Sequence, residues 1–164
     1  GLEVLEANWL FDVDFDDIHV VVQPKSIIHS MIQYKDGSVI AQMGTPDMKL
    51  PIQYALFYPE HRYLEGERLD FGKLKEITFE EPPVGVLKGL PYAYKAGRIG
   101  GSMPTVLNAA NEKAVALFLD HKIKFLDIYD IIEDAMNAHK VLPNPSLEEV
   151  LETEQWVYEH IESR

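Results

Sequence analysis

The sequence contains no cysteine, and it has far fewer basic than acidic side chains. Without cysteine, neither a disulfide framework nor a thiolate metal site can form. Its 15 lysines and arginines stand against 27 acidic residues, giving a formal net charge of −12 at pH 7. This balance argues against nucleic-acid binding, which needs clustered basic side chains. No apolar run approaches the roughly 18 residues that span a bilayer, so we expect no membrane contact.

Several signatures of function are missing as well. There is no Gly-x-Gly-x-x-Gly, so the chain carries no dinucleotide-binding fingerprint of its own. The chain has no His-x-x-x-His pair of the kind that binds zinc on a helix. The acidic loop at 12–17 lacks the central glycine and the terminal glutamate of a calcium loop. No basic leader is visible, and a cytoplasmic protein is the default expectation.

The first half of the chain mixes helix and strand. Residues 2–11 read as a helix without an N-cap residue before it, which suggests that upstream sequence is missing. Its expected apolar face consists of Leu2, Leu5, Trp9 and Leu10. Residues 18–22 predict a strand, with a second short strand possible at 77–79.

The clearest local signal in the first half is a β-hairpin. Its arms at 28–34 and 38–43 alternate in polarity around Asp36-Gly37, whose positive φ angles suit a tight turn. The alternation predicts that one face of the hairpin is covered. Residues 48–57 then read as a helix, with Asp47 as a possible N-cap and Pro51 in its first turn.

The second half predicts a small bundle of four helices. The first runs over 87–96 and ends at Gly97, and the second begins after a capping Ser102. The third covers 127–140. The last begins with a capping box in Ser146-Leu147-Glu148-Glu149. A small-residue face on the second helix favours close packing and consists of Ala109, Ala110 and Ala114.

Read without any family, each candidate for chemistry has an ordinary structural explanation. Glu3 can be a solvated helix residue, and Met48 can belong to a core. His19 and His29 flank the expected strand and can be hydrogen-bonded within the fold. Asn108 and Asn111 are unusual inside a helix, since asparagine competes for backbone hydrogen bonds, and they can form polar contacts there. Trp9 and Trp156 suggest packing.

Three segments at 23–31, 44–51 and 103–112 together resemble 1-deoxy-D-xylulose 5-phosphate reductoisomerase. They read Gln-Pro-Lys-Ser-Ile-Ile-His-Ser-Met, Gly-Thr-Pro-Asp-Met-Lys-Leu-Pro and Met-Pro-Thr-Val-Leu-Asn-Ala-Ala-Asn-Glu. The resemblance begins at Gly1-Leu2-Glu3 and runs through nearly the whole chain. It covers only the C-terminal part of that family, so the chain is expected to be a fragment of an enzyme.

The resemblance implies roles for particular residues. Glu3 matches a glutamate that binds the catalytic Mg²⁺ or Mn²⁺; the family's other metal carboxylates lie in an Asp-Ser-Glu motif that this sequence does not contain. Met48, beside Pro46, matches a methionine that covers the substrate next to the nicotinamide of NADPH. Ser26 and His29 match a segment close to the active site. The pattern departs at Gln23 and Lys25, where the family usually has His and Gln.

The predicted fold class is α+β: part of a mixed-sheet catalytic domain at 1–57, a connecting arm at 58–83 and a four-helix domain at 84–164. The whole enzyme would rearrange a sugar phosphate, 1-deoxy-D-xylulose 5-phosphate, by retro-aldol cleavage and aldol rejoining. NADPH would then reduce the product to 2-C-methyl-D-erythritol 4-phosphate. It would be a homodimer through its central domain, and this chain alone would be inactive. The alternatives are a noncatalytic α+β interaction module and a small autonomous metal-dependent enzyme.

Overall fold

The computed structural model describes residues 1–163 and confirms the α+β class, with helices accompanied by a small antiparallel sheet. Contacts divide the chain into two compact units. The helical unit consists of Gly1–His19 and the residues from Pro83 onward, and the hairpin unit is Val20–Pro82. The first nineteen residues thus pack with the C-terminal helices. The expected division at 57 and 83, which concerns the whole enzyme, stays a prediction.

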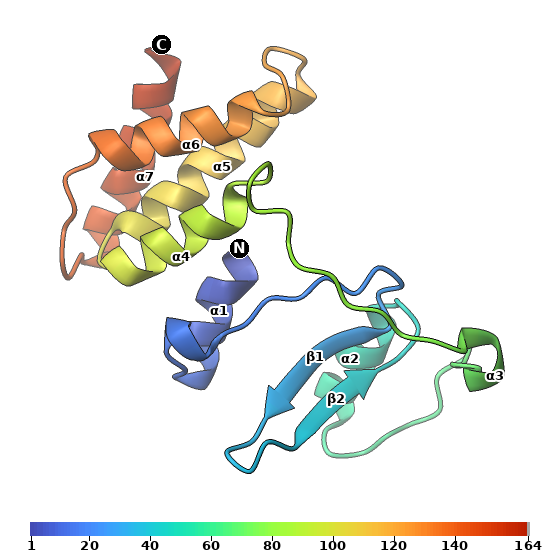
Figure 1. Cartoon of the computed structure of the whole chain (residues 1–164). Coiled ribbons are helices and arrows are strands. Elements are labelled where there is room, and N and C mark those ends of the chain that lie inside the picture. Colours follow the sequence, from blue (N-terminus) through green and yellow to red (C-terminus); the bar gives the residue numbers. More distant parts are fainter. Residues whose placement is uncertain (164) are drawn as a thin grey trace. The chain divides into compact units, whose positions relative to one another are not determined.

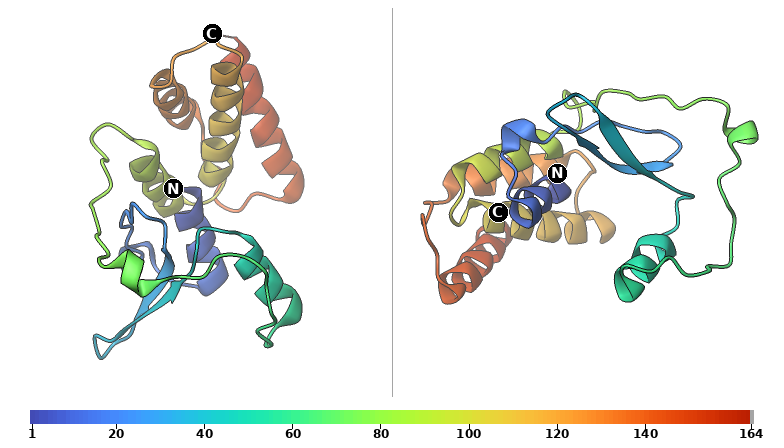
Figure 2. Two further views of the ribbon diagram at one scale, coloured as in Figure 1. Left: turned by 90° about the vertical axis from the view of Figure 1, so that its right-hand side faces the viewer. Right: turned by 90° about the horizontal axis from the view of Figure 1, so that it is seen from below.

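All four expected C-terminal helices are present: α4 (Gly89–Ile99), α5 (Met103–Leu119), α6 (Asp127–Ala138) and α7 (Leu147–Glu162). α5 lies between α6 and α7, as Figures 1 and 2 show. The predicted small-residue face of α5 is confirmed, because its alanines are buried and let the neighbouring helices approach closely. The core around them contains Val106, Ile132, Ala135, Met136, Val157 and Ile161. No helix among residues 1–163 is long and apolar enough to cross a membrane.

The ends of these helices follow the sequence signals only in part. The capping box of α7 is confirmed: Ser146 Oγ accepts from the Glu149 amide at 3.2 Å, and Glu149 Oε2 accepts from the Ser146 amide at 2.7 Å. Ser102 precedes α5 but does not cap it; its Oγ instead accepts from the Leu142 amide at 2.9 Å. Gly97 does not end α4, which continues to Ile99 and stops at Gly100 with φ 69°.

The predicted helix at 2–11 is confirmed as α1 (Leu2–Phe11), but of its expected apolar face only Leu5 is buried. Its buried residues are Val4 and Leu5, whereas Trp9 and Leu10 are 81% and 74% exposed. The reason is that only the start of α1 packs against α4. A short 3-10 helix, η1 (Phe15–Asp17), follows and packs on the same helix.

The predicted hairpin is confirmed, with β1 (Ile28–Gln33) paired to β2 (Val39–Met43). Of the two turn residues, only Gly37 has a positive φ, 88°, which glycine adopts without a Cβ penalty. The expectation of one covered face is wrong for this chain. Both faces are open, and apolar side chains on the arms and the turn are exposed: Met31, Ile32, Tyr34, Val39 and Ile40.

The rest of the hairpin unit is mostly irregular. α2 (Lys49–Phe57) matches its prediction, and α3 (Phe71–Leu74) is a single turn within the expected arm. Figure 2 shows the arm as a long open path past α3. The strands expected at 18–22 and 77–79 do not form. Val22 and Glu80 instead make one isolated antiparallel bridge, too short a pairing to count as a strand.

Candidate functional site

Two turns meet at the open end of the hairpin and carry most of the predicted site residues. The first, 23–27, leads into β1, and the second, 44–48, follows β2. Because Ile28 pairs with Met43, the two turns are forced to be neighbours. The Gly44 amide donates to the Ile27 carbonyl at 3.0 Å and ties them directly. A Cβ on Gly44 would lie 3.8 Å from His29 Nε2, so His29 sits close beside the second turn.

Ser26 occupies a strained turn. Its φ is 48°, in the left-handed region that residues other than glycine rarely adopt. The turn is held by the Ser26 amide donating to the Gln23 carbonyl at 2.9 Å and by the Ile27 amide donating to Gln23 Oε1 at 2.7 Å. Such strain persists only where surrounding contacts determine it, and it is common at ligand sites. Gln23, one of the departures from the family pattern, therefore has a structural task here.

Lys25, the other departure, ties the first turn to the arm. Its Nζ donates to the carbonyl oxygens of Leu74 and Glu76 at 3.4 and 3.2 Å. Beside it lies a shallow hollow between the two turns and the arm, lined by Lys25, Ile27, Thr45, Pro46 and residues 67–70, 73 and 74. Pro46 is the only predicted site residue on this wall. Sequence reasoning missed the arm, since no local signal links residue 25 to residues 74 and 76.

Met48 stands at the N-cap position of α2 and is 70% exposed. Asp47, expected as the N-cap, lies one residue before that position, but its Oδ1 still accepts from the Lys49 amide at 2.9 Å. The prolines on either side fix φ and make this segment rigid. Met48 therefore presents a large apolar side chain on a firm support, and the interpretation of Met48 as a core residue is wrong for this chain.

Glu3 lies in the helical unit, in the first turn of α1. Its side chain is exposed and forms no hydrogen bond or ion pair with any residue in 1–163. A free carboxylate suits a hard divalent cation, which prefers oxygen ligands. Residues 1–163 hold no group of three or more candidate metal ligands, so Glu3 can supply one ligand of such a site.

The remaining candidates do not join this site. His19 is exposed and makes no hydrogen bond with any described residue, contrary to its expected role within the fold. Asn108 is exposed and Asn111 half-buried, and within residues 1–163 neither side chain forms a hydrogen bond. Trp156 does pack, between His139 and His160 at ring distances of 5.0 and 5.2 Å.

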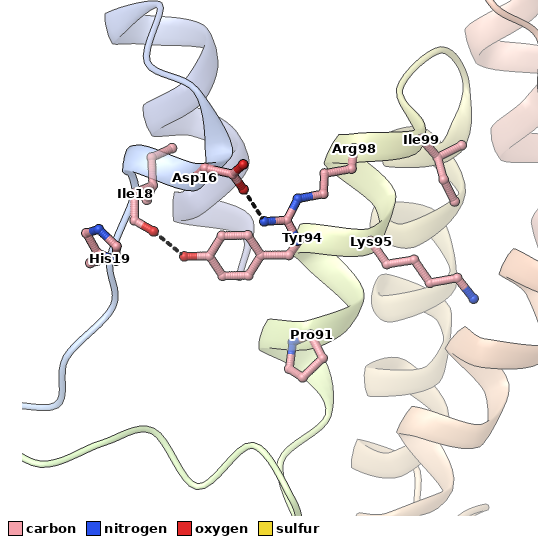
Figure 3. Close-up of a pocket in the computed structure, with 8 residues that line it drawn as sticks. All are labelled: Asp16, Ile18, His19, Pro91, Tyr94, Lys95, Arg98 and Ile99. Carbon is pink, nitrogen blue, oxygen red and sulfur yellow. Dashed lines mark hydrogen bonds and ion pairs between the residues drawn. The ribbon is translucent and has the colours of Figure 1, made fainter.

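An open hollow in the helical unit lies between α4 and the segment after η1 (Figure 3). The Tyr94 hydroxyl donates to the Ile18 carbonyl at 2.6 Å, and Arg98 pairs with Asp16 at 2.6 Å. Burial raises the pKa of the Tyr94 hydroxyl, so it remains a donor. Among the candidates for chemistry, His19 lines this hollow, whereas Glu3, Ser26, His29, Pro46 and Met48 do not.

Residues 43–160 match the family model described as DXP reductoisomerase C-terminal domain. The chain belongs to the DXP reductoisomerase family. Among its relatives, the 1-deoxy-D-xylulose 5-phosphate reductoisomerases of Agathobacter rectalis and Lachnospira eligens are 58% and 60% identical to it over 164 residues. Both alignments cover the whole chain but only 43% of the relative.

Solved reductoisomerase structures share the fold. The Zymomonas mobilis enzyme in complex with NADPH has a TM-score of 0.92 and 40% identity over 99% of this chain and 43% of its own. A DOX-P reductoisomerase in complex with NADPH, fosmidomycin and magnesium has a TM-score of 0.93 and 36% identity, over 99% of this chain and 42% of its own. The chain thus spans less than half the length of the reductoisomerases that it matches.

Proposed function

We propose that the chain is the C-terminal part of an enzyme that converts 1-deoxy-D-xylulose 5-phosphate to 2-C-methyl-D-erythritol 4-phosphate with NADPH and Mg²⁺ or Mn²⁺. One NADPH and one proton are consumed and NADP⁺ leaves for each substrate rearranged and reduced. The observation that carries this proposal is family membership, with a relative that is 58% identical over the whole chain. The motif resemblance in the sequence supplies the site residues, which are Glu3, Ser26, His29, Pro46 and Met48. Solved relatives described with NADPH and magnesium support the cofactors.

Glu3 is proposed as a ligand of the divalent metal. When bound, the metal would chelate neighbouring substrate oxygens and stabilise negative charge that develops during carbon–carbon cleavage. The free, exposed carboxylate on the rigid start of α1 fits this task. A single carboxylate holds such an ion weakly, so the remaining ligands would come from the part of the enzyme that this chain does not span.

The hairpin unit is proposed to hold the substrate. The Ser26 hydroxyl and the His29 imidazole form no side-chain hydrogen bond within residues 1–163, so both are free to bind substrate oxygens. Met48, supported by Pro46, would cover the substrate and the nicotinamide and keep water from the aldehyde before hydride transfer. Its 70% exposure leaves the side chain available for that contact.

Three further expectations belong to this proposal. The enzyme would be a homodimer through its central domain, which is supported by the uncovered apolar side chains of the hairpin. It would act in the cytoplasm. The 164-residue chain would not turn over substrate alone, since it has no dinucleotide fingerprint and only one of the expected metal carboxylates.

The test uses the full-length enzyme, with NADPH oxidation followed by absorbance and the product identified by mass spectrometry. Glu3→Gln keeps the size of the side chain but removes the ligand charge, so we expect turnover to fall by orders of magnitude and Mn²⁺ affinity to weaken. Glu6→Gln is the matched control, because Glu6 is another exposed carboxylate on α1. Near-normal turnover of Glu3→Gln at limiting Mn²⁺ would contradict the metal assignment.

A further inference from the structure

α1 and η1 both pack on α4, and at one point of this contact an added Cβ would force their side chains to shift. A Cβ built on Gly97 would lie 2.2 Å from Phe15 Cζ and 2.8 Å from Leu5 Cδ2, well inside the distance at which carbon atoms clash. Leu5 is buried in the core, so it has little room to move. Gly97 stands in the interior of α4, where glycine is intrinsically unfavourable compared with alanine. Close packing explains why it is there.

A second close contact lies at the start of α1, next to Glu3. A Cβ on Gly1 would lie 2.9 Å from Ala93 Cβ and 3.0 Å from the Gly89 carbonyl oxygen. The backbone of the first turn of α1 therefore rests directly on α4. Any displacement of α1 from α4 moves the Glu3 carboxylate with it, because Glu3 lies two residues from this contact.

Polar contacts of α4 hold the other end of the segment. Tyr94 and Arg98, one helical turn apart, bond to Ile18 just after η1 and to Asp16 within it (Figure 3). Gly97 lies beside them on the same helix. The start of α1 and the residues of η1 up to Ile18 thus both contact α4, and the Arg98–Asp16 pair is the exposed and hence weaker of these contacts.

We propose that α4 positions the metal-binding carboxylate of Glu3. Gly97 is the positioning residue, because its lack of a side chain determines how closely α1 and η1 pack on α4. This inference rests on the proposed function, since Glu3 matters only if it is a metal ligand. It gives the C-terminal helices a part in metal binding that acts through the position of α1.

The test is Gly97→Ala in the full-length enzyme, with Gly89→Ala as the matched control. Both add one methyl group to α4, but the nearest atom to a Cβ on Gly89 is Tyr129 Cε1 at 3.7 Å, an ordinary contact. Direct titration of Mn²⁺ by electron paramagnetic resonance should show about tenfold to a hundredfold weaker binding for Gly97→Ala, the range typical of lost support around a metal ligand. Gly89→Ala should bind Mn²⁺ like the parent, and NADPH affinity should not change in either variant.

Rescue separates positioning from general damage. Phe15→Leu shortens the side chain that the added methyl group meets, so Gly97→Ala with Phe15→Leu should recover most of the Mn²⁺ affinity. A folded Gly97→Ala enzyme with parental Mn²⁺ affinity would overturn the proposal. If Gly97→Ala does not fold, Tyr94→Phe decides, since it removes only the hydrogen bond to Ile18: Mn²⁺ affinity several-fold weaker supports positioning, and unchanged affinity refutes it.

Glu3→Gln, measured in the same titration, separates the metal role of Glu3 from the positioning role of α4. If Glu3→Gln leaves Mn²⁺ affinity unchanged, the metal role of Glu3 in the proposed function is wrong. If Glu3→Gln weakens Mn²⁺ binding while Gly97→Ala does not, only the positioning role of α4 is wrong.

Discussion

Truncating Met48 to alanine separates a side chain that covers a ligand from one that supports a core. Met48 is 70% exposed, so roughly a third of it is buried in this chain. Burying a whole methionine side chain stabilises a fold by about 1.5–3 kcal/mol. A third of that is roughly 0.5–1 kcal/mol, and little cavity can form at an exposed position. We therefore expect Met48→Ala to lower the free energy of unfolding of the chain by no more than about 1 kcal/mol.

Met136→Ala provides the matched control, because Met136 is 4% exposed and lies in the helical core. Emptying that position should cost about 2–5 kcal/mol through lost burial and a residual cavity. Urea unfolding of the two variants of the chain gives the stability comparison. In the full-length enzyme, kcat/KM of Met48→Ala should fall clearly, because water reaches the aldehyde and the substrate is held less firmly.

Two results would refute this reasoning in different ways. If Met48→Ala lowers the free energy of unfolding as much as Met136→Ala does, the Met48 side chain supports the fold and is not free to cover a ligand. If the stability loss is small but kcat/KM is unchanged, Met48 covers nothing that the reaction needs.

Three other expectations follow from the structure. Burial lowers the pKa of His139 below its usual 6.5, so the unfolded chain binds a proton there more readily than the folded chain. The free energy of unfolding should therefore fall as the pH drops below about 6.5. His139→Gln should reduce this fall, measured by urea unfolding at about pH 7.5 and about pH 5.5. Ser146→Ala removes the hydroxyl half of the α7 capping box and should cost about 0.5–2 kcal/mol in urea unfolding, whereas Ser163→Ala, at the other end of α7, should cost less. The 164-residue chain should show no saturable NADPH binding in a fluorescence titration, and micromolar binding would contradict the proposed division of the enzyme.

Some of the signals that act over a few residues were read correctly from the sequence. The capping box of Ser146 and Glu149 and the turn at Gly37 depend on neighbours within three or four positions, and both are confirmed. Gly97 shows where such signals fail. A glycine near the end of an apolar pattern resembles a helix terminus, but its reason for being there is the ring of Phe15, far away in the sequence. The expected face of α1 is right only at Leu5 for the same reason, since packing on α4 buries Val4 as well and leaves Trp9 and Leu10 exposed.

The candidate site was predictable only through its motifs, and the structure explains why. Many acidic side chains in this chain are already engaged: Asp47 and Asp70 accept from backbone amides at helix starts, and Asp16 pairs with Arg98. Glu3 has no such partner, which is necessary for a metal ligand, but Glu6 on the same helix is equally free. Chemistry alone therefore cannot choose between these two carboxylates. The choice depends on where α1 lies, and this gives its close contacts with α4 their weight: Gly1 and Leu5 lie against Ala93 and Gly97, so the position of α1 on α4 decides which carboxylate can reach a metal.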